Sequence, residues 1–266
     1  MKATTTSRRS DWLVPVGLIM LSLVPAIAGT ARLRQLGRGG PITPDNARFF
    51  AMPLPVVLHI LSVIPYSMLG AFQFSSSFRR RRRVWHRVAG RVLGVAGLVT
   101  ALTGLWMAHF YPWPEGDGEA LYVLRLVFGT AMLVSMVLGL HAIRRRDFNA
   151  HGDWMIRAYA IGMGAGTQVL THLPYFMFVG TPDEPTRAVL MAAGWVINVV
   201  VAEWVIQKGR ASAVSRRAVI SQSARITWVG STRAARSAGI SVATTAGSNS
   251  NNGTTMNVAG SRGSTS

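Results

Sequence analysis

The chain has 266 residues, of which 49% are hydrophobic and only 14% are charged, and it contains no cysteine. An ordinary soluble domain carries about 25% charged residues, so this composition argues against a soluble enzyme. The absence of cysteine excludes disulfides, thiolate metal sites and covalently attached haem. The net charge of +18 comes from basic residues that cluster between long apolar segments, which is typical of an integral membrane protein.

Six apolar segments are each long enough to cross about 30 Å of hydrocarbon as an α-helix. Backbone groups in lipid must satisfy their own hydrogen bonds, and no segment alternates with the period of a barrel strand. The sequence therefore predicts an all-α fold, a polytopic transmembrane helix bundle with a membrane domain over residues 12–206. The expected spans cover about 12–29, 50–74, 88–110, 120–143, 154–179 and 188–206.

The first segment has two interpretations. Arg8 and Arg9 precede an apolar run that ends in Ala26-Ile27-Ala28, a pattern that resembles a secretory signal with its cleavage site. The run is longer than the 7 to 15 residues of a signal core, which favours a retained helix after a short amino-terminal segment, residues 1–11.

The connection after the second span contains seven arginines and no acid between Ser77 and Arg91. The loop 144–153 and the tail are also basic, whereas the loop 111–119 carries three acids and no base. By the positive-inside rule, both termini are expected in the cytoplasm. The first outer loop argues against this orientation, because it contains Arg32, Arg34, Arg38 and Arg48.

The tail, residues 207–266, has eight basic residues and no acid, and it is rich in Ser, Thr, Gly and Asn. This composition predicts a disordered basic tail. It either binds anionic lipid headgroups at the cytoplasmic face, at about 1 kcal/mol per cation, or has no role. No nucleic acid partner is expected, because the arginines lie beside membrane-spanning segments.

Two motifs stand at the expected cytoplasmic ends of spans: H-R-x-x-G-R at 86–91 and H-x-x-W-M-I-R at 151–157. With these motifs, His59 and the segment 70–74, the stretch from about 52 to 206 resembles the predicted membrane proteins grouped as domain of unknown function 2306. The resemblance implies a polytopic, mostly bacterial membrane protein, and hence the bacterial inner membrane, without an established reaction.

The arginines of both motifs have two interpretations. Arg87 and Arg91 share a helix face, and Trp154 and Arg157 are three residues apart. Either these residues anchor the helices at the lipid interface, or they contact an anion or a lipid headgroup.

The histidines suggest a cofactor. His59 and His172 lie at similar depth in the outer half of different spans, and two neutral imidazoles are the ligands of six-coordinate haem b. A second haem site would use His141 with His86 or His151. The sequence thus raises the hypothesis of a bis-histidine haem b redox protein, with haem iron as its metal and with catalytic residues unassigned.

Two alternatives remain open. A transporter or lipid-handling protein would use the polar residues inside the spans, although Arg125 can snorkel and Glu203 can pair with a basic loop residue. A non-catalytic scaffold, assembled as a homo-oligomer or with a partner subunit, would use the pairs Gly90/Gly94 and Gly162/Gly166 for close helix packing. The polar residues are Arg125, Gln168, Asn198 and Glu203.

Overall fold

The computed structural model describes residues 7–75, 81–215, 218–219 and 222. These residues contain no strand, so the all-α class is confirmed. The chain divides into two compact units, Met1–Ile206 and Gln207–Ser266. The helices are α1 (Ser7–Arg38), α2 (Ala47–Ala51), α3 (Pro53–Gly70), η1 (Ala71–Phe74), α5 (Arg83–Phe110), α6 (Glu119–Arg144), α7 (Phe148–Gly162), α8 (Gly164–Phe178) and Glu184–Ser215.

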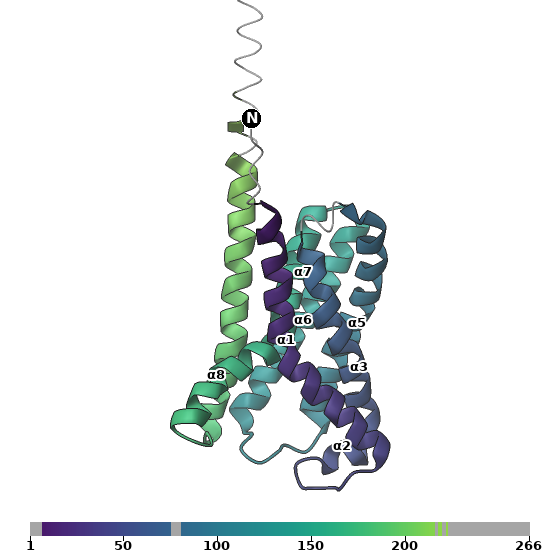
Figure 1. Ribbon diagram of the computed structural model, residues 1–266, viewed down its shortest axis with the longest axis vertical. Coiled ribbons are helices and arrows are strands. Elements are labelled where there is room, and N and C mark those ends of the chain that lie inside the picture. The colour runs from purple at the N-terminus through teal and green to yellow at the C-terminus, as the bar shows by residue number, and fades with distance from the viewer. Residues whose placement is uncertain (1–6, 76–80, 216–217, 220–221, 223–266) are drawn as a thin grey trace, which may run out of the picture. The chain divides into compact units, whose positions relative to one another are not determined.

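Helices of the first unit pack mostly against their neighbours in the sequence (Figure 1). α3 packs on α5, α5 on α6 and α6 on α7, whereas α1 contacts both α3 and α8. Proline begins α3, where its missing N–H costs no hydrogen bond. The side chain of Asp147 caps α7 by accepting a hydrogen bond from the N–H of Ala150 at 3.0 Å.

The core of this unit is built from aromatic and methionine side chains around glycines. Tyr66 and Met136 are buried between α3, α5 and α6, and a Cβ added at Gly97 would lie 2.7 Å from side-chain atoms of both. Tyr159 of α7 donates a hydrogen bond to the carbonyl of Ser67 at 2.5 Å. The glycine therefore sets how closely α5 approaches its neighbours.

Five helices are long and apolar enough to cross a membrane, against the six spans expected from the sequence. Their outward faces carry exposed apolar side chains such as Leu61 and Val95, which indicates contact with lipid. The segment expected to span as one helix, 154–179, is divided at Met163 into α7 and α8, and neither part reaches the length of a complete span.

Three glycines at this break let neighbouring helices pack closely against α7 and α8. A Cβ would lie 2.9 Å from Tyr66 if added at Gly162, and closer still to Nε1 of Trp195 if added at Gly164 and to the carbonyl oxygen of Leu21 if added at Gly166. A side chain at any of these positions would push a neighbouring helix away.

Polar side chains at the break form hydrogen bonds that satisfy the backbone. Asn198 donates a hydrogen bond to the carbonyl of Ala160 at 3.0 Å and accepts one from the hydroxyl of Thr167 at 2.7 Å. A helix break in lipid requires such partners, because the freed backbone groups cannot bond to water.

The last helix runs from Glu184 to Ser215, so the first nine residues assigned to the tail, 207–215, are helical. The last helix thus extends nine residues beyond the boundary at 206 expected for the last span. The remainder from 223 to 266, like residues 1–6 and the arginines at 79 and 80, lies outside the described residues.

Candidate functional site

A cavity of about 230 Å³ lies at the end of the bundle where α5 ends and α6 begins. Its walls come from α2, from the consecutive stretch of α5, the following loop and α6, and from the Glu184–Ser215 helix. The lining residues include Arg48, Phe49, Gly104, Met107, Ala108, Tyr111, Trp113, Asp117, Arg125 and Arg187. We call this the arginine cavity.

Asp117 is the central acidic group of the cavity. Its side chain is only 1% exposed, and its carboxylate lies 2.5 Å from Nη1 of Arg125 and 2.9 Å from Nε of Arg187. A turn presents it, in which Gly116 adopts a φ of 78° and the N–H of Asp117 bonds to the carbonyl of Pro114 at 3.1 Å. That left-handed conformation favours glycine.

Arg48 brings a third guanidinium to the same cavity. The group lies 4.6 Å from the centre of the Phe49 ring, and Arg32 lies 4.7 Å from the same ring. No carboxylate forms an ion pair with Arg48 in the part of the chain that the structure describes. Burial lowers the pKa of Arg48, and the charge of Asp117 acts in the opposite direction.

The loop that carries Asp117 is tied to α2 and α3. The hydroxyl of Tyr111 donates a hydrogen bond to the carbonyl of Met52 at 2.6 Å, and its ring packs edge-on against Phe49 at 5.5 Å. Burial raises the pKa of Tyr111. The aromatic side chains thus hold Arg48 beside the acidic loop.

Three arginines and one aspartate leave the arginine cavity with a formal charge of +2. Guanidinium groups present planar pairs of N–H donors that match carboxylate and phosphate oxygens. The cavity has the composition of a site for a small anion. No cluster of three or more metal-ligating His, Cys, Asp or Glu side chains occurs among the described residues.

The two histidines expected to bind haem lie on different helices. Nδ1 of His59 in α3 is 3.2 Å from the carbonyl of Thr100, and Nδ1 of His172 in α8 is 2.8 Å from the carbonyl of Gln168. Because a carbonyl only accepts, each ring carries its proton on Nδ1 in these bonds. No hydrogen bond or ring contact joins the two imidazoles among the described residues, and α1 packs against both helices that carry them.

The histidines of the opposite end lie on three helices. His141 is exposed on α6, His86 is half-buried on α5, and Nδ1 of His151 lies 2.9 Å from the carbonyl of Gly139. The contact of His151 ties α7 to α6.

The residues expected to contact anions at that end fall into two groups. Arg87 and Arg91 are exposed on α5. Arg157 stacks 4.7 Å from the centre of the Trp154 ring and binds both carboxylate oxygens of Glu203, at 2.5 and 3.0 Å. Glu203 therefore pairs with Arg157, an arginine of α7.

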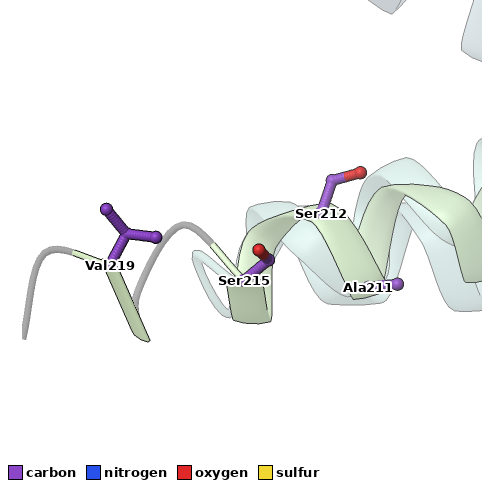
Figure 2. A pocket seen from close by; sticks show the side chains of 4 residues that line it. All are labelled: Ala211, Ser212, Ser215 and Val219. Carbon is purple, nitrogen blue, oxygen red and sulfur yellow. The ribbon is translucent and has the colours of Figure 1, made fainter.

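A second hollow lies near the end of the Glu184–Ser215 helix, in the second unit. It is lined by Ala211, Ser212, Ser215 and Val219, and Figure 2 shows these side chains spaced along the chain rather than gathered around one point. All four are exposed and none is titratable, so this surface offers no chemistry comparable to the arginine cavity.

The charged residues of the arginine cavity could be read from the sequence, but the sequence did not show that they lie together. It placed Arg48 and the acidic loop on the same expected side of the membrane, and it attributed Arg125 to snorkelling. It assigned no role to Phe49, Asp117 or Arg187. The signal for this site was the basic Arg48 and the acidic loop, which the sequence placed on the same side of the membrane.

The comparisons with known proteins support the membrane class. A sequence profile described as "Predicted membrane protein (DUF2306)" matches residues 56–206, more than half of the chain, and confirms the resemblance based on the two motifs. Neither a curated protein nor a solved structure matches the chain.

Proposed function

We propose that this protein, which belongs to the DUF2306 family of predicted membrane proteins, binds a small anionic ligand in the arginine cavity. The observation that carries the proposal is the position of Arg48, a partly buried guanidinium that faces a cavity without a carboxylate of its own. Asp117 neutralises one charge of the Arg125 and Arg187 pair, so an anion in the cavity would balance the remaining charge.

The surroundings strengthen such an interaction. Met107, Ala108 and Trp113 supply apolar walls, and an ion pair gains strength where water is partly excluded. The lowered pKa of Arg48 reflects the cost of burying its charge. A bound carboxylate or phosphate would offset that cost through charge-assisted hydrogen bonds.

We place the cavity on the non-cytoplasmic side of the bacterial inner membrane. α5 begins at Arg83, beside the arginine cluster, and ends at Phe110, beside the cavity. At 1.5 Å per residue the two ends are roughly 40 Å apart, the thickness of a bilayer. The positive-inside rule then assigns the arginine cluster to the cytoplasm and the cavity to the other face.

The test compares two arginine variants in binding assays with inorganic phosphate and acetate as probes. Full-length protein in an uncharged detergent is titrated by calorimetry. Arg48→Gln removes the unpaired charge and is expected to weaken binding about 10- to 100-fold, the range of one or two lost charge-assisted hydrogen bonds.

Arg38→Gln is the matched control, because Arg38 is exposed at the end of α1 and lines no part of the cavity. It should bind both probes as the unaltered protein does. Equal losses in the two variants, or no binding of either probe by the unaltered protein, would contradict the proposal.

The haem site, transport and a scaffold role stay predictions. The His59 and His172 pair would need a gap for haem between α3 and α8, both of which pack against α1. Gln168 and Asn198, which were considered for transport, donate to the carbonyls of Met191 and Ala160. The anion-binding proposal is a specific form of the ligand-handling alternative, and it leaves movement of the ligand across the membrane as a separate question.

A further inference from the structure

We infer that the ligand of the arginine cavity is an amphiphile, with an anionic head group and one aliphatic chain that extends from the arginines along α5 to Gly104. A medium-chain carboxylate and a monoalkyl phosphate both have this chemistry. The inference rests on the proposed function and specifies the class of anion that the cavity binds.

The charged groups of the cavity gather at the loop that contains Asp117. Arg187 stands in the first turn of its helix, and Arg48 lies in α2, before α3 begins. Arg125 lies deeper, in the second turn of α6, but its guanidinium reaches back to the carboxylate of Asp117. The charge of the cavity is therefore confined to its outer end.

The inner end of the cavity is apolar and is formed by one face of α5. Gly104, Met107, Ala108 and Tyr111 line the cavity at intervals of three and four residues, which places them on the same side of the helix. The first three have no charged or hydrogen-bonding side chain. Because Gly104 precedes the end of α5 at Phe110 by six residues, the cavity extends about 9 Å along the helix.

The inner end lies at the depth of the hydrocarbon, and its length is limited. Leu102, close to Gly104 in α5, is exposed, as expected of a side chain that contacts lipid. Among the described residues of α5, none before Gly104 lines the cavity. The ring of His59 lies next to this glycine, with Cε1 at 3.4 Å from a Cβ added there. The chain of the ligand should therefore end near Gly104.

A small inorganic anion would fill only the outer end of the cavity. The apolar inner end would then stay in contact with water or remain empty, whereas a methylene chain would bury it. A length of about 9 Å corresponds to about eight carbons of an extended chain with bonds of about 1.5 Å. The single face of α5 that lines this end has room for one chain, which favours a single-chain amphiphile over a two-chain phospholipid.

The experiment is calorimetry on the full-length protein in an uncharged detergent, with acetate, butanoate, hexanoate, octanoate and dodecanoate as probes. The affinity is expected to rise about threefold with each methylene up to octanoate, as burial of a methylene predicts. It should then level off toward dodecanoate, whereas partition into the micelle continues to increase with chain length. Methyl phosphate and octyl phosphate repeat the comparison, and the head group that binds more tightly identifies the source as a carboxylate or a phosphate.

Variants of Gly104 test the position of the chain through the ratio of octanoate affinity to acetate affinity. Gly104→Leu should lower this ratio at least about tenfold and Gly104→Ala about threefold, because each side chain occupies space meant for methylenes. Gly94→Ala is the matched control, since a Cβ there lies 3.5 Å from Leu140 and Gly94 lines no part of the cavity. Because Gly104→Leu can impair folding, Gly104→Ala and the series on the unaltered protein decide.

Equal affinity for acetate and octanoate overturns this inference while the proposed function stands. An affinity that rises steadily to dodecanoate, with the same slope in Gly104→Ala, also overturns it, because it reports partition into the micelle. Tighter binding of dioctanoyl phosphatidic acid than of octyl phosphate overturns the single chain. Absence of binding by every probe, or octanoate binding that Arg48→Gln leaves unchanged, overturns the proposed function itself.

Discussion

Asp117 holds two guanidinium groups with one carboxylate, and its burial makes that arrangement sensitive to change. Removing one partner of a buried ion pair leaves an uncompensated charge, at a cost of about 3–5 kcal/mol. The two arginines are partly exposed, with 26% and 33% of their side chains accessible, so the cost here falls toward the lower end. The same carboxylate fixes the positions of two of the three arginines that line the arginine cavity.

His59 and His172 allow a test at the same scale. A bis-histidine haem b site predicts a Soret band in the visible spectrum of purified protein, lost in His59→Ala and in His172→Ala. His109→Ala is the control, because this ring bonds to the hydroxyl of Tyr122 at 2.9 Å and belongs to neither expected site. Expression with added haem and no Soret band would eliminate the site.

At the scale of single elements, two of the glycines of α5 occupy different surroundings. A Cβ at Gly97 would lie 2.7 Å from Cε of Met136 and from Cε2 of Tyr66, whereas nothing lies within 4 Å of one at Gly90. Gly97→Ala is expected to lower stability by about 1–3 kcal/mol through overpacking. Gly90→Ala should leave it unchanged or raise it by up to about 1 kcal/mol through helix propensity.

Thermal unfolding of the two variants in the same detergent measures this difference. A midpoint for Gly97→Ala at or above that of Gly90→Ala would show that α5 does not pack as described. Glycine spacing alone suggested the pair Gly90 and Gly94, yet Gly94 and Gly97 are the positions that face neighbouring side chains. The pattern indicated close packing but not which face of the helix was involved.

The break between α7 and α8 shows a similar limit of prediction. Apolar composition over 154–179 predicts one span, and three glycines do not by themselves interrupt a helix in lipid. What stabilises the break is Asn198, whose side chain bonds to Ala160 and Thr167 from another helix. A contact between helices of this kind is not visible in hydropathy.

On the scale of the whole molecule, the helical membrane class and most span positions were predictable, because lipid imposes length and hydrophobicity on each segment. The candidate site was not, because Arg48, Asp117, Arg125 and Arg187 are brought together by tertiary packing. Of the four cations that contradicted the charge rule, Arg32, Arg34 and Arg38 lie in α1, and Arg48 alone lines the arginine cavity beside the acidic loop. Arg48 belongs to the arginine cavity rather than to the topology signal.

The orientation is testable because the chain contains no cysteine, so a single introduced thiol can be labelled without background. Glu115→Cys in the acidic loop is expected to react with a membrane-impermeant maleimide in right-side-out vesicles. Arg145→Cys, exposed in the loop between α6 and α7, should react only in inverted vesicles. The opposite pattern would move the arginine cavity to the cytoplasmic face.

The spread of the cavity's charged groups along the chain also has a consequence for biosynthesis. Asp117 and Arg125 enter the membrane together, whereas Arg187 arrives only with the Glu184–Ser215 helix. During translation, one of the two ion pairs of Asp117 is therefore absent until the last helix has joined the bundle. Insertion of that helix supplies the second ion-pair partner of Asp117. The arginine cavity therefore forms only when the first unit is completely assembled.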